Sequence, residues 1–163
     1  MQNQSKNQSK ILIIGIGNIL LRDEGVGVRV AEELKKRKLP KNVEVQDGAT
    51  LGLSLLNFLE NYDKVIVIDA VKGGKKPGTI YKFDLYEFID DFNFPLSMSS
   101  MHDFDFIYAV KNIGREFYKL PEKIVVVGVE PEKIEPGLEL TEKINNTIPE
   151  IIKAVLEELN NWI

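Results

Sequence analysis

Three short apolar runs, each rich in β-branched residues, most strongly constrain how this chain can fold. They read ILIIGIG at 11–17, KVIVIDA at 64–70 and KIVVVGV at 123–129. Each run is continuous rather than alternating in polarity, which is typical of strands that are covered on both faces. Two further runs alternate and are expected nearer a sheet edge: VEVQD at 43–47 as a short strand, and GTIYKFDLYEF at 78–88 as an edge strand or hairpin arm.

Segments with a helical spacing of apolar residues separate these runs. Val26, Val30 and Leu34 mark a helix over about 23–38. Further helices are expected around 51–59, around 106–117 and from about 144 to 159, where Pro149 predicts a kink or a later helix start. Because strands and helices alternate, the sequence predicts an α/β fold in which helices cover both faces of a parallel or mostly parallel sheet.

The size and composition of the chain limit its function. A chain of 163 residues fits one domain, and we expect a flexible tail at 1–10 and a single domain at 11–163. No apolar run approaches the ~20 residues that span a bilayer, and residues 1–10 lack the apolar run of a secretory signal. The absence of cysteine excludes disulfides and thiol chemistry and fits a reducing cytoplasm.

The charge of the chain argues against a nucleic-acid partner. Its net charge is −4, whereas proteins that neutralise many phosphates usually carry a basic excess. The basic cluster at 35–38 falls at the end of a predicted helix, where it favours the negative end of the helix dipole.

Acidic side chains follow the predicted strands at the points where those strands end. Asp23 and Glu24 follow the first run, Asp47 and Asp69 close two others, and Glu130 follows the last. Each acid taken singly also fits a helix cap or a turn. Ligands of open α/β sheets bind at the carboxyl ends of the strands, so together these acids predict a site on one rim of the sheet.

Glycines in the loop after the first strand support a site there and also raise an alternative. Gly25 and Gly27 open a predicted helix, where glycine costs up to ~1 kcal/mol relative to alanine, so the backbone is expected to approach another group closely. Gly15 and Gly17 follow a strand and precede a helix, as in a dinucleotide-binding loop. Position 20 lacks the third glycine of that motif, and the acidic pair disfavours a pyrophosphate at the helix start.

His102 is the only histidine of the chain and lies in the polar stretch SMSSMHDFDF at 97–106. A lone histidine often has a surface or packing role. If this loop folds over the rim, however, His102 joins Glu24 and Asp69. One imidazole and two carboxylates suit a borderline divalent ion such as nickel, zinc or iron, and three protein ligands leave positions open for water or substrate. With no thiolate or second imidazole, a metal that is met transiently or on a partner is the more natural expectation.

Five segments resemble blocks of the hydrogenase maturation proteases. ILIIGIGNILLRDEGVGVRVAEEL at 11–34 is similar to the opening signature of that family, with its glycine-asparagine loop, acidic pair and spaced glycines. The later blocks follow in the family's order: DGATLG at 47–52, VIVIDAVKGGKKPGTI at 65–80, SMSSMHDF at 97–104 and VVVGVEPEKIEPGLELTEKI at 125–144. The resemblance extends from Lys10 to about Leu159. One departure is Ala49, where the family often has a second glycine.

The resemblance implies a five-stranded, twisted, mostly parallel sheet between helices. It also implies a cytoplasmic endopeptidase of aspartyl type that removes the C-terminal extension of a nickel-iron hydrogenase large-subunit precursor after nickel insertion. Nickel would be a transient cofactor carried by the substrate, with Glu24, Asp69 and His102 as its contacts, and Asp69, Glu24 and Asp47 would form the catalytic set. Surface loops at 72–76 and 90–95 are candidates for selecting the partner.

Two points stay open at the level of sequence. Either the metal activates the attacking water, or a carboxylate such as Asp47 or Asp69 acts as general base. Alternative functions are a non-catalytic nickel-binding accessory protein of hydrogenases, a nucleotide-binding module, and a spore-protein protease of similar fold that cleaves without nickel.

Overall fold

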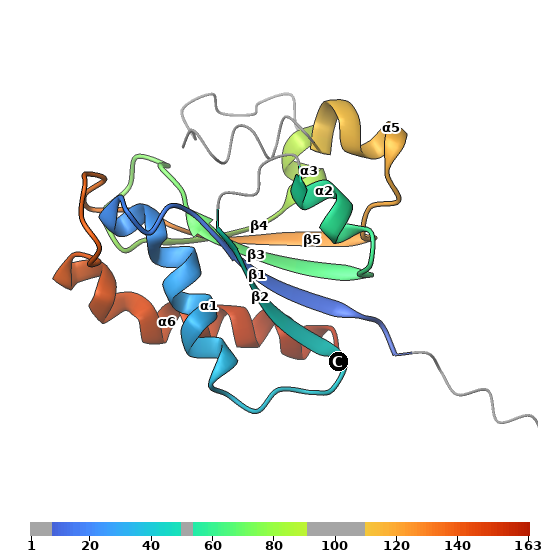
Figure 1. Cartoon of the computed structure of the whole chain (residues 1–163), viewed down its shortest axis with the longest axis horizontal. Helices are drawn as coiled ribbons and strands as arrows, with labels where there is room; N and C mark the ends of the chain where they lie inside the picture. Colours follow the sequence, from blue (N-terminus) through green and yellow to red (C-terminus); the bar gives the residue numbers. More distant parts are fainter. Residues whose placement is uncertain (1–7, 50–53, 91–109) are drawn as a thin grey trace, which may run out of the picture.

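A five-stranded sheet forms the centre of the protein (Figure 1). The computed structural model describes residues 8–49, 54–90 and 110–163. The strands are β1 (Ile11–Ile16), β2 (Val43–Ala49), β3 (Lys64–Ala70), β4 (Ile80–Asp84) and β5 (Lys123–Val129), in the order β2-β1-β3-β5-β4. Edge strand β4 is antiparallel to β5, and the other neighbours pair in parallel. The predicted mostly parallel sheet, with the alternating runs at its edges, is therefore confirmed.

Helices cover both faces of this sheet, as predicted (Figure 1). One face carries α1 (Val26–Lys35) and α6 (Glu142–Asn161). The other carries α2 (Ser54–Leu59), α3 (Leu85–Asp90) and the segment made of the π-helix η2 (Val110–Gly114) and α5 (Arg115–Phe117). A short 3-10 helix, η1 (Arg22–Gly25), connects the loop after β1 to α1.

The central strands contribute to two separate apolar cores, because successive residues of a strand point to opposite faces. The core shared with α1 and α6 includes Ile13, Ile68, Leu34 and Ile151. The core shared with α2 and α3 includes Ile14, Val67, Leu56 and Leu85. Both faces of β1, β3 and β5 are covered, which explains why their sequences are continuously apolar.

Helix α1 lies directly against the backbone of the sheet because two glycines leave no side chain between them. A Cβ on Gly15 would lie 2.0 Å from the carbonyl oxygen of Gly27, and a Cβ on Gly27 would lie 2.1 Å from the carbonyl oxygen of Ile68. Both distances are far inside van der Waals contact, and the opposing atoms belong to the backbone. The start of α1 is therefore fixed at the carboxyl ends of β1 and β3.

Several element boundaries differ from the sequence predictions. The first predicted helix is divided into η1 and α1, and α6 begins at Glu142, so the later start at Pro149 was wrong. The strand predicted over 78–88 ends at Asp84, whose Oδ1 accepts a hydrogen bond from the backbone N–H of Glu87 at 3.1 Å. Leu85 and Ile89, four residues apart, are both buried on one face of α3, so helical packing decides this segment.

The segment before β1 is tied to its neighbours at two points. The Asn42 side-chain amide donates to the carbonyl of Ser9 at 2.8 Å, and the backbone N–H of Lys10 donates to Asp63 Oδ2 at 2.8 Å. Residues 1–7 of the predicted tail, 51–53 of the second predicted helix and 106–109 of the third lie outside the described residues. Within the described ranges, no helix is long and apolar enough to cross a membrane.

We expect Gly15→Ala to lower the free energy of unfolding by about 1–3 kcal/mol, because the new methyl group would force α1 away from β1. Urea unfolding followed by circular dichroism measures the change. Asn160→Ala, at an exposed position of α6, is the control and should shift stability by no more than about 0.5 kcal/mol. An unchanged unfolding midpoint for Gly15→Ala would contradict the role given to this close approach.

Candidate active site at the carboxyl edge of the sheet

Glu24 and Asp69 come together at the carboxyl edge of the sheet. Asp69 is the next-to-last residue of β3, and Glu24 lies in η1, directly after the loop that leaves β1. Both residues lie close to Gly17: a Cβ on this glycine would lie 2.0 Å from the Glu24 carbonyl oxygen and 3.6 Å from Asp69 Oδ1. The φ of Gly17 is +135°, a backbone conformation that favours glycine. The structure thus places two of the predicted site residues side by side.

The carboxylate of Asp69 is buried and only half satisfied. The residue is 1% exposed, and its Oδ1 accepts a hydrogen bond from the backbone N–H of Ala70 at 2.8 Å. Its Oδ2 is buried and has no hydrogen-bond partner among the described residues. Most buried polar atoms in proteins have a partner, and leaving one without costs free energy. An acceptor oxygen in this state is suited to receive a proton donor or a cation.

Glu24 is nearly as buried as Asp69, with 6% of its surface exposed. Its backbone N–H donates to the carbonyl of Leu21 at 3.3 Å, which closes the turn of η1. Burial at the start of a helix is unusual for an acid that serves only to charge a helix terminus. This placement favours a chemical role over the simpler capping role.

Asp23, the neighbour of Glu24, belongs to the scaffold. It is fully buried, and its Oδ2 accepts from the backbone N–H groups of Glu132 and Lys133 at 3.0 and 2.9 Å. Its Oδ1 accepts from the backbone N–H of Thr141 at 2.8 Å, and the Thr141 hydroxyl lies within hydrogen-bond distance of both oxygens. One carboxylate thus joins η1 to the loop between β5 and α6.

Glu130 has a comparable structural role after β5. Its carboxylate accepts from the backbone N–H groups of Gly73 at 2.6 Å and Gly74 at 3.3 Å, and from the hydroxyl of Tyr81 at 2.8 Å. Burial, together with this hydrogen bond to Glu130, raises the pKa of Tyr81 above its ordinary value. Glu130 therefore fixes the 72–76 loop, whose lysines are exposed.

Asp47 is placed differently from the other predicted acids. Its side chain is exposed, and its Oδ1 accepts from the backbone N–H of Ala49 at 2.8 Å, which forms a turn at the end of edge strand β2. Ala49 has a φ of +41°, in the left-handed region that glycine occupies more easily. Since β1 lies between β2 and β3 in the sheet, Asp47 is separated from Asp69 by one strand.

His102 lies outside the described residues, as does most of the 90–95 loop, so their places in the site stay predictions. Within the described part of the chain, no group of three metal-ligating side chains occurs. Glu24 and Asp69 form the described part of the predicted metal-contacting set.

The loop glycines have internal packing partners, which removes the support for a nucleotide site. A Cβ added to Gly15, Gly17 or Gly27 would lie only 2.0 to 2.1 Å from a backbone carbonyl oxygen, far inside van der Waals contact. The space that a pyrophosphate would need against this backbone is occupied by α1 and η1.

Two structurally important partners were missed by the sequence reasoning. Thr141 lies 118 residues from Asp23, and Tyr81 lies 49 residues from Glu130. Thr141 precedes the predicted last helix, as an N-cap residue would, but no local pattern connects it to an acid near the other end of the chain.

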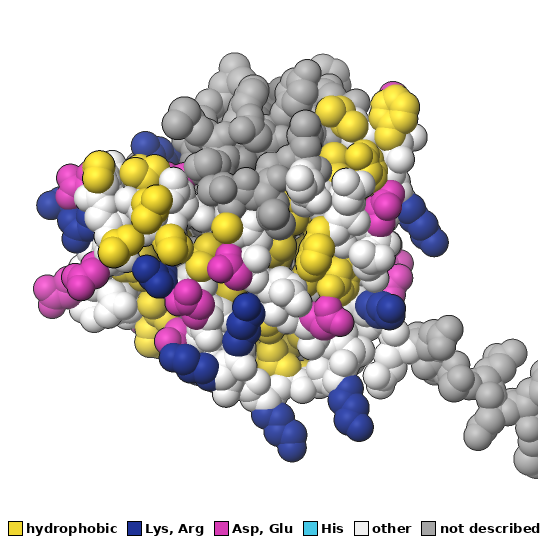
Figure 2. Space-filling model, in the orientation of Figure 1, with side chains coloured by type: hydrophobic (Ala, Val, Ile, Leu, Met, Phe, Trp, Pro, Cys, Tyr) yellow, Lys and Arg dark blue, Asp and Glu magenta, His cyan; other side chains and the backbone are white. Residues whose placement is uncertain are grey.

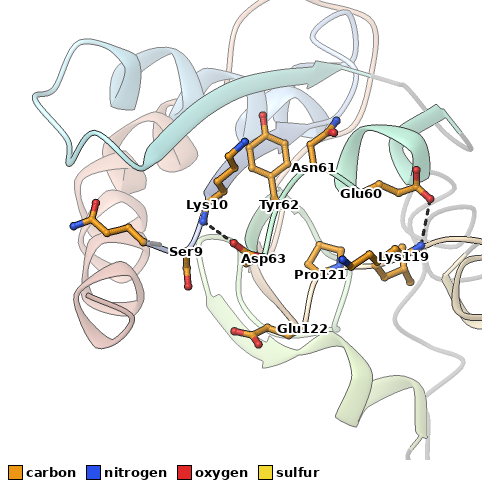
Figure 3. Close-up of a pocket in the computed structure, with 11 residues that line it drawn as sticks. Ser9, Lys10, Glu60, Asn61, Tyr62, Asp63, Lys119, Pro121 and Glu122 are labelled. Atoms are coloured by element: carbon orange, nitrogen blue, oxygen red, sulfur yellow. Dashed lines mark hydrogen bonds between the residues drawn. The ribbon is translucent and has the colours of Figure 1, made fainter. Parts of the chain in front are cut away.

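A hollow of about 780 Å³ lies at the opposite edge of the sheet, lined by residues that precede β1, β3 and β5 (Figure 3). Its hydrogen bonds join Lys10 to Asp63 and Lys119 to Glu60, through backbone N–H donors. These contacts tie the ends of the strands together. Ligands of open α/β sheets bind at the carboxyl edge, so the Glu24–Asp69 edge is the better candidate site.

We expect Asp23→Asn to lower the free energy of unfolding by about 1–3 kcal/mol. Each oxygen of Asp23 accepts from backbone N–H groups, so an amide turned either way sets its NH₂ against a donor. Urea unfolding measures the loss. Glu139→Gln, on the exposed part of the same loop, removes the same charge without a buried partner and should leave stability nearly unchanged. Equal stability of the two variants would count against the role of Asp23 as a structural anchor.

Comparison with known proteins identifies the family. The model of the hydrogenase maturation protease family matches residues 28–158. The hydrogenase 2 maturation protease of Escherichia coli (strain K12) is 37% identical over 152 residues, which cover 92% of this chain and 90% of that protein. The hydrogenase expression/formation protein HupD of Bradyrhizobium diazoefficiens is 37% identical over 163 residues, covering 97% and 82%. The structure of the hydrogenase maturating endopeptidase HybD from E. coli superposes with a TM-score of 0.78 at 34% identity, over 93% of each chain. The chain therefore belongs to the hydrogenase maturation protease family and is a peptidase.

Proposed function

We propose that this peptidase removes the C-terminal extension of a nickel-iron hydrogenase large-subunit precursor, after nickel has been inserted. Membership of the family supplies the peptidase activity. The observation that carries the rest is the buried Oδ2 of Asp69, which lacks a partner among the described residues. The other oxygen of this carboxylate and the Glu24 carbonyl both lie close to Gly17. The cysteine-free composition fits the reducing cytoplasm that we infer as the compartment of this reaction.

In this proposal, nickel is part of the substrate, and the protease reads whether it is present. Glu24, Asp69 and His102 would offer it two carboxylates and one imidazole, a donor set that suits a borderline divalent ion. Contact with a cation would relieve the unpaired oxygen of Asp69. A site without thiolates holds such an ion weakly. Weak binding suits an enzyme that must contact the nickel of its substrate and then release the processed subunit.

The orientation of Asp69 supports a direct part in the reaction. The backbone N–H of Ala70 holds its Oδ1, so the carboxylate is fixed while Oδ2 stays available. That oxygen would either contact the substrate's nickel or take the proton from the water that attacks the peptide carbonyl. Asp47 is the second candidate for the base: its carboxylate is exposed at the same edge, although it already closes a turn through Ala49.

The test is a gel assay in which the enzyme is mixed with a C-terminally extended large subunit, prepared with and without nickel. A small downward shift is expected only with the nickel-loaded precursor. Glu24→Gln, Asp69→Asn and His102→Ala should each slow processing about 10²-fold or more, and Glu157→Gln, at an exposed position of α6, should process normally. Normal processing by all three site variants would end the proposal. If no nickel-loaded precursor, including those of the source organism, is shortened, an accessory role is favoured.

The unfolding midpoint of Asp69→Asn distinguishes a chemical role of Asp69 from a structural one. The asparagine of Asp69→Asn keeps an oxygen for the Ala70 N–H and replaces the unpaired, charged oxygen by a neutral amide. We therefore expect the unfolding midpoint to stay level or rise while processing is lost, as happens when a strained functional group is removed. A clear loss of stability would indicate that Asp69 mainly supports the fold.

A further inference from the structure

We propose that Ile19, Leu20 and Leu138 form an apolar lip beside the active site, on which the precursor docks an apolar, extended segment adjoining the bond to be cut. This inference rests on the proposed function and adds to it the chemistry that the enzyme selects in its substrate. It is carried by the exposure of the three side chains, the way two loops hold them together, and their continuity with Glu24.

The lip gathers most of the exposed large apolar side chains of the described residues. Leu20 is 59% exposed, Leu138 62% and Ile19 37%. The remaining two, Phe117 and Ile163, lie on α5 and at the last residue of the chain. Figure 2 shows hydrophobic side chains gathered over the start of α1 and the loop that precedes α6. Clustered apolar side chains on a surface commonly mark a binding site, whereas scattered ones need no explanation.

Backbone hydrogen bonds bring the two halves of the lip together from distant parts of the sequence. The N–H of Gly137 donates to the carbonyl of Leu20 at 2.9 Å, and the N–H of Arg22 donates to the carbonyl of Gly137 at 3.0 Å. Leu21 and Gly137 form a parallel bridge between these two contacts. Leu20 and Leu138 are therefore presented by adjacent segments of one surface.

The loop that carries Ile19 and Leu20 is held in its shape before any substrate arrives. The Asn18 side-chain oxygen accepts from the N–H of Leu20 at 2.9 Å, and its carbonyl accepts from the N–H of Leu21 at 3.1 Å. On the other half, Arg29 donates to the carbonyl of Leu138 at 2.9 Å. A surface ordered in advance loses little conformational entropy on binding, which favours recognition of a flexible peptide.

The cationic side chain that follows Leu21 is already paired within the protein. Arg22 forms an ion pair with Glu135 at 2.9 Å, and its Nε also donates to the carbonyl of Glu139. The charge of Arg22 is therefore already neutralised, and the exposed carboxylate of Glu139, next to Leu138, disfavours an acidic segment. An apolar segment of the substrate is the occupant that this surface fits.

The lip is continuous with the candidate active site. The Cα of Ile19 lies 2.8 Å from the position that a Cβ on Gly25 would take, so the lip backbone contacts the residue after Glu24. A peptidase must bind its substrate chain on at least one side of the scissile bond. An extended chain advances about 3.3 Å per residue, so a peptide crossing Glu24 reaches the lip within a few residues.

The experiment measures kcat and KM of the full-length enzyme with nickel-loaded precursor for Leu20→Glu and Leu138→Glu. We expect KM to rise about tenfold or more, the scale of leaving a leucine side chain without its apolar partner, with kcat changed less than about twofold. Ile163→Glu, an equally exposed apolar position at the end of the chain, is the matched control and should leave both constants unchanged. Leu20→Met should restore the KM of the native enzyme.

Several results would contradict the proposal that the lip binds the substrate. If KM is unchanged in both glutamate variants while the native enzyme processes its precursor, the lip does not bind the substrate. The proposed function is then unaffected. A fall in kcat alone would make these residues part of the chemistry instead. A dimer of the native enzyme that dissociates in Leu20→Glu at unchanged KM would assign the lip to a second copy of the chain. If the native enzyme shortens no precursor, both proposals fall together. Because the two variants lie in different loops, misfolding of one leaves the other as the test.

Discussion

The close approach of α1 to the sheet is the constraint on which the rest of the structure depends. Gly15 and Gly27 let backbone meet backbone there, at distances that no side chain permits. The same approach brings η1 over Gly17, so that the carbonyl of Glu24 and the carboxylate of Asp69 both lie close to one glycine. The glycines that suggest a phosphate-binding loop in the sequence thus have a packing role. They determine where the backbone of Glu24 approaches the carboxylate of Asp69, and this edge of the sheet is the candidate site.

The number of hydrogen-bond partners, rather than the residue type, distinguishes the structural acids from the acid of the candidate site. Asp23, Glu130 and Asp69 are all buried acids near the carboxyl edge of the sheet. Asp23 and Glu130 accept backbone N–H donors on both carboxylate oxygens, which offsets the cost of burying their charge and ties distant loops together. Asp69 retains a buried oxygen with no partner in the described ranges. A fold retains such a defect at a site where something else satisfies it, and so Asp69 differs in kind from its two neighbours.

How much the sequence could predict depends on the range over which each feature is encoded. Continuous apolar runs predicted the central strands, and strand ends predicted that Glu24 and Asp69 would share a rim, because both signals are local. The division between strand and helix at Asp84 was not predicted, since Leu85 and Ile89 fit either period until the second core selects the helix. The anchoring role of Asp23 depends on Thr141, 118 residues away, and no local pattern encodes that pairing. The position of His102 stays a prediction because it lies outside the described residues.

One loop, which leads from β1 into η1, carries both Glu24 of the candidate site and the lip residues Ile19 and Leu20. The loop is fixed at both ends: Gly17 is held by its N–H to the carbonyl of Ala49, and Asp23 by its bonds to the β5–α6 loop. Between these points, the side chains of Ile19 and Leu20 project outward without supporting either core. We therefore expect replacement of Leu20, the more exposed of the two, to leave the positions of Glu24 and Asp69 unchanged. Relatives that process different precursors would be free to vary these side chains while keeping the same chemistry, so the fold itself separates substrate choice from catalysis.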